Sequence, residues 1–253
     1  MAFPDRHQGI GHAIALAYAA QGAHLALHAR STDKLQAVAK EASSIAKPKG
    51  YEITTTAAKD LSVDISGGAT FDILINYAGF ALGAPATFHE QSIEDISTMI
   101  QTNIFGFRVA ANAMLNEGGM AKAKHGTIIN ATSTTGLEVP PLPGEAVYHS
   151  SKACQEAFSN VLRNETVGTN ARILTLRPGV VQTNFHEQRV GYDQGQYDEF
   201  IDGIEALVAE DVAKAAVWMV QSEERVSIRA LDVIPSSQRT LRLFDRDWEK
   251  RNK

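Results

Sequence analysis

A tyrosine and a lysine stand one helical turn apart in the segment AVYHSSKACQEAF, residues 146–158. Tyr148 and Lys152 are four residues apart, so on a helix their side chains share one face. A free phenol has a pKa near ~10, too high for a base at neutral pH, but a neighbouring ammonium group lowers it. Such a pair could exchange a proton with an alcohol or a carbonyl. An ordinary aromatic–cation pair on a helix surface has the same spacing, so only the rest of the chain can distinguish a catalytic pair from a surface pair.

Two further polar residues are candidates for the same site. Ser133 ends an apolar, β-branched run at residues 126–133, and Thr132, Thr134 and Thr135 beside it are lesser candidates. Asn103 stands in the middle of a long helical pattern, where its amide could hold water or backbone groups.

The N-terminal part carries weak signals for a nucleotide. Gly9, Ile10 and Gly11 open an apolar helical run, and glycines there would let a phosphate approach backbone N–H groups. An ordinary turn explains two glycines equally well. Arg30 and Ser31 follow the next strand, where an adenine ribose would lie. Arg30 could stack on adenine and pair with a phosphate, which favours NADP(H) over NAD(H). A surface arginine ahead of a capping serine is the alternative.

Small residues follow two later strands and would let a cofactor ring pass close to the backbone. The first set is in NYAG, residues 76–79, and the second in RPGVVQT, residues 177–183. Either could be ordinary loop chemistry. The candidates are Asn76, Ala78, Gly79, Pro178, Gly179, Val181 and Thr183.

Strand and helix patterns alternate along the whole chain. The predicted strands are 23–30, 53–59, 71–76, 126–133, 171–179 and 228–234, and the predicted helices are 10–22, 31–46, 92–118, 147–167 and 209–221. This alternation predicts an α/β fold, a Rossmann-like doubly wound parallel sheet in three α/β/α layers. We expect one domain over residues 1–253, in which the aperiodic segment 184–205 forms a substrate-side lid. Its aromatic residues, expected to shape the pocket, are Phe185, Tyr192, Tyr197 and Phe200.

Composition excludes several classes of function. The 253 residues are 44% hydrophobic and 21% charged, with a net charge of −5, which indicates a globular protein without a nucleic-acid footprint. No apolar run approaches the ~18 residues of a membrane span, and the N-terminus lacks a signal-peptide pattern. The single cysteine, Cys154, excludes an internal disulfide, and the histidines show no metal-ligand spacing. We expect a cytoplasmic protein with a small-molecule substrate and without a metal, nucleic-acid or membrane partner.

These motifs stand in the order found in the short-chain dehydrogenase/reductase family, which the chain resembles over nearly its whole length. Each motif is unspecific alone, but the ordered set is highly specific. It comprises GIG at 9–11, NYAG at 76–79, Asn103, Ser133, Tyr148 with Lys152, and Pro-Gly-x-Val-x-Thr at 178–183.

The resemblance implies a role for each residue. Tyr148 is the general acid in reduction and the base in oxidation, while Lys152 lowers its pKa and binds the nicotinamide ribose. Ser133 orients and polarises the carbonyl, and Asn103 holds a water that continues the proton relay. Hydride moves between the nicotinamide and the carbonyl carbon. The implied cofactor contacts are Gly9, Ile10, Gly11, Arg30, Ser31, Asp60, Asn76, Ala78, Gly79, Arg108, Tyr148, Lys152, Pro178, Gly179, Val181 and Thr183.

The chain departs from the family pattern near the cofactor's phosphates. Pro4 and Asp5 stand where the family has Thr and the first Gly, and only MAF precedes them. The first, central strand is therefore predicted to be absent, which would expose two strand edges. Eleven residues separate Asp60 from Asp72, too few for the helix usual there. We assign Asp60 as the adenine-side carboxylate, with Asp64 as the alternative.

Two smaller departures lie nearer the catalytic candidates. Tyr77 replaces the second Asn of the family's Asn-Asn-Ala-Gly, and two extra residues lie between Gly136 and Tyr148. The sequence predicts an NADP(H)-dependent oxidoreductase that interconverts a carbonyl and a secondary alcohol, as a homodimer or homotetramer. It also predicts weaker cofactor binding than in a full-length relative. The alternative is a catalytically impaired or inactive relative with a regulatory or scaffolding role.

Overall fold

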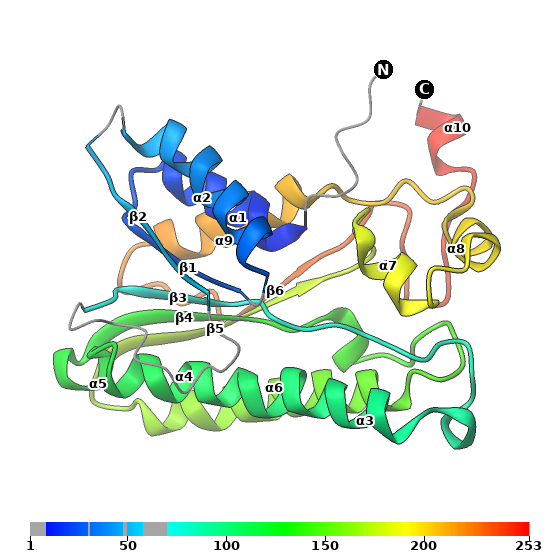
Figure 1. Ribbon diagram of the computed structural model, residues 1–253, viewed down its shortest axis with the longest axis horizontal. Helices are drawn as coiled ribbons and strands as arrows, with labels where there is room; N and C mark the ends of the chain where they lie inside the picture. The colour runs from blue at the N-terminus through cyan, green and yellow to red at the C-terminus, as the bar shows by residue number, and fades with distance from the viewer. Residues whose placement is uncertain (1–8, 30, 48–49, 58–69, 253) are drawn as a thin grey trace.

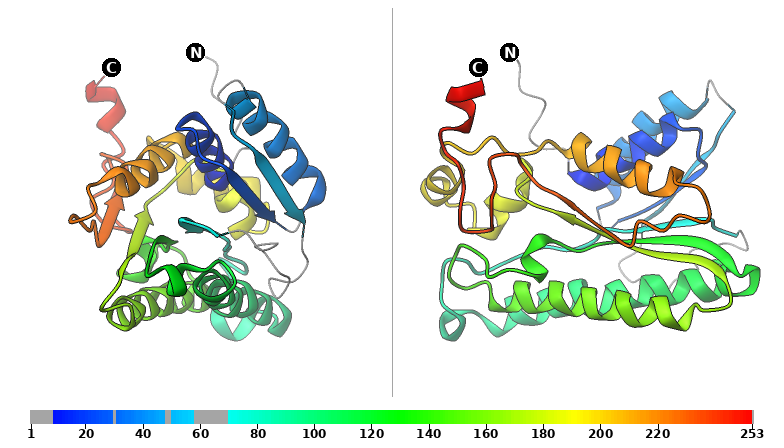
Figure 2. Two further views of the ribbon diagram at one scale, coloured as in Figure 1. Left: turned by 90° about the vertical axis from the view of Figure 1, so that its left-hand side faces the viewer. Right: turned by 180° about the vertical axis from the view of Figure 1, so that it is seen from behind.

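Strands and helices alternate along the chain as the apolar patterns predict. The computed structural model describes residues 9–29, 31–47, 50–57 and 70–252. Its strands all run parallel and lie between two layers of helices (Figures 1 and 2). The predicted Rossmann-like α/β fold is confirmed.

The strands form two separate groups. One group pairs β1 (Leu25–Ala29) with β2 (Ile53–Ala57). The other has the order β3-β4-β5-β6, with bounds Ile73–Asn76, His125–Ala131, Asn170–Pro178 and Ala230–Val233. In register, Asn76 of β3 lies beside Asn130 of β4, which brings the carboxyl ends of these strands to one edge.

The helices form one layer on each face of the strands. One layer contains α1 (Ile10–Ala20), α2 (Thr32–Ala46) and α9 (Ala209–Gln221) (Figure 1). The opposite layer contains α3 (Ile93–Ile100), α4 (Phe107–Asn116), the short α5 (Met120–Ala123) and α6 (Ala146–Glu165). None of the helices in the described residues has the length and apolar character needed to cross a membrane.

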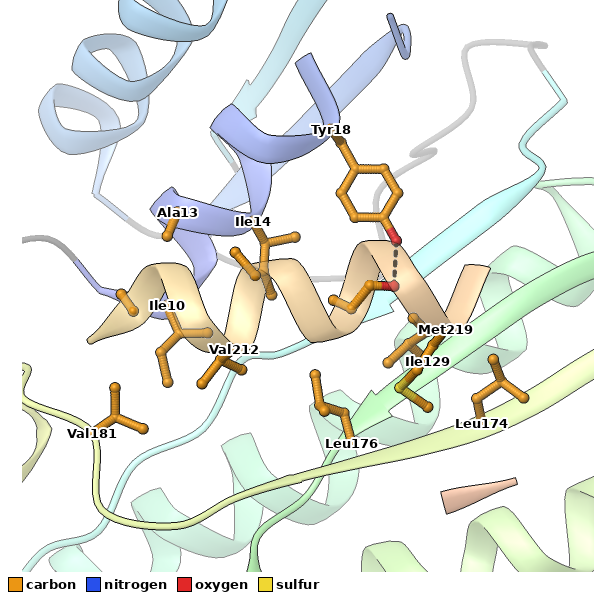
Figure 3. Packing of buried hydrophobic residues seen from close by; sticks show 13 residues of the cluster. Ile10, Ala13, Ile14, Tyr18, Ile129, Leu174, Leu176, Val181, Val212 and Met219 are labelled. Atoms are coloured by element: carbon orange, nitrogen blue, oxygen red, sulfur yellow. Dashed lines mark hydrogen bonds between the residues drawn. The ribbon is translucent and has the colours of Figure 1, made fainter. Parts of the chain in front are cut away.

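Alternate residues of the central strands belong to two separate hydrophobic cores, one on each face of the sheet, because successive side chains of a strand point to opposite faces. Ile129, Leu174 and Leu176 pack beneath α1 and α9 (Figure 3). Ile128 and Ile173 pack on the other face against α4 and α6. The covering of both faces explains why these strands read as continuous apolar runs.

The helix α1 packs directly on α9 over the centre of the molecule. Ile10, Ile14 and Tyr18 belong to the same buried cluster as Val212 and Met219 of α9 (Figure 3). The Tyr18 hydroxyl donates a hydrogen bond of 3.1 Å to the carbonyl oxygen of Ala216. This bond holds the last turn of α1, while the packing of Ile10 in the same cluster holds its first turn, where the predicted phosphate loop begins.

The sheet is divided where the resemblance places a central strand. Among the described residues, β1 pairs with β2 and with no other strand. In the same residues β3 pairs with β4 alone, so no strand pairs with the edge of β3 that faces away from β4. The partly buried side chains of Leu25, Ile73, Ile75 and Tyr77 pack against the α1–α9 cluster across this division. Residues 1–8, on which the prediction of an absent first strand depends, lie outside the described residues, and so do most residues between Asp60 and Asp72.

Two predictions need correction. The segment 184–205 contains two helices, α7 (Asn184–Arg189) and α8 (Gln194–Ile201), although its sequence lacks a clear period. Both are short, and they begin at the capping side chains of Thr183 and Asp193, so they depend on local capping more than on periodicity. The long helix predicted at 92–118 is interrupted by a π-helical turn, Gln101–Gly106.

Further short elements were not predicted. They are two 3₁₀ turns, Phe88–Glu90 and Thr134–Gly136, and the C-terminal helix α10, Trp248–Asn252. The chain between β6 and α10 contributes Leu241, which is buried.

Candidate active site

Tyr148 lies in the first turn of α6, facing the end of β4. Its side chain is only 6% exposed. Ser133 follows β4, and its hydroxyl accepts a hydrogen bond of 3.1 Å from the backbone N–H of Thr135. The Ser133 side chain is close enough to the Tyr148 hydroxyl to lower its pKa by hydrogen bonding. The strand end and the helix start therefore place two hydroxyl groups side by side.

Lys152 lies one turn further along α6 and is 4% exposed. Its Nζ is 5.8 Å from the centroid of the Tyr148 ring. It donates hydrogen bonds to the carbonyl oxygen of Ala131 (3.3 Å) and to Oε1 of Gln155 (3.1 Å). These two acceptors hold the ammonium group beside the phenol.

Burial shifts the pKa values of this pair in opposite directions, because it disfavours the charged form of each. Burial raises the pKa of Tyr148, while the charge of Arg189 and the bond to Ser133 act against it. Burial lowers the pKa of Lys152 to about 8, against the charge of Glu156. Burial therefore favours the protonated phenol of Tyr148, and the role of Lys152 in lowering its pKa stays a prediction.

Asn103 is fully buried in the π-helical turn between α3 and α4. Its Oδ1 accepts a hydrogen bond from the N–H of Phe80 (3.1 Å). Its Nδ2 donates to the carbonyl oxygen of Phe80 (2.8 Å) and to the Ser151 hydroxyl (3.1 Å). The Asn103 carbonyl oxygen accepts from Nε2 of Gln155 (2.6 Å). The side chain thus fastens the loop after β3 to α6, and its role in holding a water stays a prediction.

One cavity at the carboxyl ends of the strands is lined by three of the four catalytic candidates, Ser133, Tyr148 and Lys152. Six of the predicted cofactor contacts line it too: Ile10, Gly79, Pro178, Gly179, Val181 and Thr183. A Cβ atom on Gly79 would lie 3.2 Å from Oδ1 of Asn103 and 3.4 Å from Nζ of Lys152. A side chain at this position would crowd the catalytic candidates, which explains the glycine.

Other predicted contacts lie away from this cavity. Asn76 donates to the carbonyl oxygen of Phe107 (2.8 Å) and ties β3 to α4. Arg108 is exposed and donates to the sulfur of Cys154 (3.0 Å), on the surface between α4 and α6. The exposed residues Gly9, Gly11, Ser31 and Ala78 do not line the cavity, within the described part of the chain. Arg30 and Asp60 lie outside the described residues.

Aromatic side chains of α7 and α8 also line the cavity. Phe185 of α7 and Phe200 of α8 line it, as the lid prediction expects. The exposed Tyr192 does not, and neither does the buried Tyr197, among the lining residues of the described chain. Residues that sequence reasoning missed are Tyr77, Pro141, His186, Arg189, Leu241 and Phe244. Among these residues, only Arg189 could have been found from the sequence, because it is a charged residue within an aromatic segment.

Comparison with known proteins identifies the family. The family model described as short chain dehydrogenase matches residues 6–192. The chain belongs to the short-chain dehydrogenase/reductase family. Relatives within it include an NADP-dependent 3-hydroxy acid dehydrogenase of Shigella flexneri, 33% identical over 91% of this chain and 92% of the relative. A sulfoacetaldehyde reductase of Chromohalobacter salexigens is 32% identical over 91% of each chain.

Solved structures of this family share the fold. A closed form of serine dehydrogenase complexed with NADP⁺ superimposes with a TM-score of 0.79 at 31% identity, covering 91% of this chain and 92% of that one. Short-chain dehydrogenases/reductases are oxidoreductases, so the expected enzyme class is confirmed.

The contacts of Asn103 generate a prediction about stability. Asn103→Ala removes three buried hydrogen bonds, and at about 1 kcal/mol each the free energy of unfolding should fall by roughly 3 kcal/mol. Urea titration followed by circular dichroism measures this. The matched control is Asn112→Ala on the exposed side of α4, expected within about 0.5 kcal/mol of the parent chain. Equal stabilities for the two variants would contradict the structural role of Asn103.

Proposed function

We propose that this chain interconverts a carbonyl and a secondary alcohol, with Tyr148 as the general acid and base and NADP(H) as the cofactor. The observation that carries the proposal is that Ser133, Tyr148 and Lys152 line one cavity beyond the strand ends. This is where parallel α/β sheets bind their ligands.

The side chains divide the work on the substrate oxygen. In reduction, Tyr148 donates its phenolic proton to the carbonyl oxygen, and its raised pKa keeps that proton in place until the substrate is bound. Ser133, hydrogen-bonded to Tyr148, donates to the same oxygen and orients it. The Lys152 ammonium group stabilises the phenolate that remains. In oxidation the same groups act in reverse.

The residues around the cavity fit the nicotinamide half of NADP(H). When bound, this cofactor supplies or accepts the hydride. Gly179 lets the loop after β5 pack against Gln238, since a Cβ there would lie 2.4 Å from Oε1 of Gln238, which accepts a hydrogen bond from the N–H of Val180 (3.2 Å). Lys152 can bind the ribose and Thr183 can offer a hydroxyl. The choice of NADP(H) rests on the NADP-dependent relative and the NADP⁺-bound neighbour.

Catalysis is favoured over the regulatory or scaffolding alternative. A protein that only binds partners has no need to keep a buried lysine beside a buried tyrosine, because burying a charge costs free energy. The relatives reported above have enzyme names. Those names also favour a small, acidic carbonyl or alcohol as the substrate.

The role of Tyr148 is tested by removing its hydroxyl. In Tyr148→Phe, kcat for NADPH-dependent carbonyl reduction should fall about 10²- to 10⁴-fold, because the substrate oxygen loses its proton donor. The variant should still bind NADPH, which is measured by the change in NADPH fluorescence. Tyr192→Phe is the matched control, since this tyrosine is 68% exposed and should retain full activity. Residual activity above a tenth of the parent value would refute the assignment.

A pH profile tests Lys152. Its pKa of about 8 means that the ammonium form persists below pH 8 and is lost as the pH rises. The kcat/KM of reduction should be level below pH 8 and fall by about tenfold per pH unit above it. The Glu156 charge raises the pKa of Lys152, so Glu156→Gln should move the fall to lower pH. A profile that stays level to pH 10 in the parent chain would disprove the assignment.

We also propose a homodimer or homotetramer in the cytoplasm. Support for self-association comes from large apolar side chains exposed along α3, the π-helical turn and α6: Ile93, Ile100, Phe105 and Val161. Light scattering of the purified protein should give a molar mass two or four times that of one chain. The Phe105→Glu variant should have a molar mass closer to that of the monomer. A monomeric parent chain would disprove this part.

A further inference from the structure

A buried arginine lines the cavity beside several aromatic rings. Arg189, from α7, is 6% exposed and lines the cavity together with His186 and the rings of Phe185, Phe200 and Phe244. Its guanidinium carbon lies 5.3 Å from the centroid of the Phe200 ring. A charge placed among aromatic side chains is costly unless it has partners, so its contacts show what it can bind.

Glu145 holds the guanidinium group from outside the cavity. Nη2 of Arg189 donates to Oε2 of Glu145, whose side chain is 2% exposed. The N–H of Leu142 donates to the same oxygen (3.3 Å). Within the described residues, Arg189 lines the cavity and Glu145 does not. The carboxylate therefore offsets the charge and fixes the orientation of Arg189 without occupying the ligand's space.

His186 supports the arginine from a second side. Burial, together with the charge of Arg189, lowers the pKa of His186 to about 3, so the imidazole is neutral. The distance between Nη1 of Arg189 and Nδ1 of His186 is 3.2 Å. Because an arginine only donates, Nδ1 is the acceptor and the ring proton is on Nε2. His186 thus adds an N–H donor to the cavity wall.

One of the three guanidinium nitrogen atoms of Arg189 has no hydrogen-bond partner among the described residues. This atom, Nε, is buried, and Oε1 of Glu145 is likewise buried without a partner there. A buried N–H group without a partner is costly, and in a ligand cavity it indicates a ligand that supplies the acceptor. A carboxylate fits, because its two oxygens can accept parallel hydrogen bonds from a guanidinium group.

The arginine lies within reach of the reacting groups. The ring of Phe185 is 5.5 Å from that of Tyr148 and 5.2 Å from that of His186. The charge of Arg189 is also close enough to act on the Tyr148 phenol. A small molecule whose carbonyl lies at Tyr148 can therefore extend an acidic group to Arg189.

We propose that Arg189, oriented by Glu145 and His186, binds the carboxylate of the substrate and so selects short hydroxy acids and their oxo acids. This inference rests on the proposed function and adds to it the residue that determines specificity. Lys152, the other cation among the described residues that line the cavity, lies beside Tyr148, so Arg189 is the cation next to the phenylalanines that can favour an anion.

The test compares an acid with its uncharged ester. The kcat/KM for NADP⁺-dependent oxidation is measured for 3-hydroxybutyrate and for methyl 3-hydroxybutyrate. Arg189→Gln should lower the value for the acid by roughly 10- to 100-fold and that for the ester by less than about threefold. Arg189→Lys keeps the pair with Glu145 but loses the planar fork, so it should lower the acid-to-ester ratio about tenfold. An equal fall for acid and ester in these variants would overturn the proposal, since a purely structural arginine affects both.

A control variant and a binding measurement distinguish failure of the carboxylate site from failure of the proposed function. Arg172→Gln removes an arginine at the amino end of β5, bonded to Thr127 and to the carbonyl oxygens of Val220 and Ser222. Its acid-to-ester ratio should equal that of the parent chain. Butyrate, which cannot react, should raise the unfolding temperature of the parent chain but not of Arg189→Gln. If no substrate is oxidised yet butyrate binds through Arg189, the proposed function fails and the carboxylate site stands; absence of butyrate binding to the parent chain would refute that site.

Discussion

The burial of one ammonium group constrains the geometry of the whole site. Lys152 is surrounded by protein, so its charge must be met by acceptors from several elements. Ala131 at the end of β4 and Gln155 on α6 supply them. Gln155 in turn binds the carbonyl oxygen of Asn103, and Asn103 binds the backbone of Phe80. A chain of hydrogen bonds therefore runs from the lysine to the loop after β3.

The π-helical turn follows from this same constraint. The Gln155 side chain donates a hydrogen bond to the carbonyl oxygen of Asn103. A side chain from another element that bonds to a helix carbonyl is one cause of a local break in the hydrogen bonds of that helix. The wider turn carries Asn103 inward, where it is fully buried.

The division of the sheet has little effect on this network. The network lies on β4, α6 and the turn between α3 and α4, all on one side of the division. The start of α1 is fixed by α9 through Ile10, Ile14 and Val212. The residues proposed for proton transfer and those proposed for the cofactor's phosphates thus depend on different parts of the fold.

The sequence predicted those features that depend on local pattern or on an ordered set of motifs. The strands, α9 and the cluster of Ser133, Tyr148 and Lys152 belong to this kind, since strand ends of a parallel sheet meet at one edge. Other features depend on contacts between distant segments. Arg189 meets Glu145 across 44 residues, and no local period indicates that pairing. Arg108 shows the converse, because a match in motif order did not bring its side chain to the cavity.

Burial gives Tyr148 and Lys152 complementary electrostatic roles. It favours the neutral phenol of Tyr148 and disfavours the charged ammonium form of Lys152. In the proposed reaction, the phenol releases its proton to a substrate oxygen, and a phenolate would form near a cation whose Nζ is 5.8 Å from the ring centroid. In a cavity of low dielectric constant their attraction is stronger than in water. Because this attraction would arise only as the proton leaves, the lysine would stabilise the transition state more than the resting enzyme, which is the condition for catalysis.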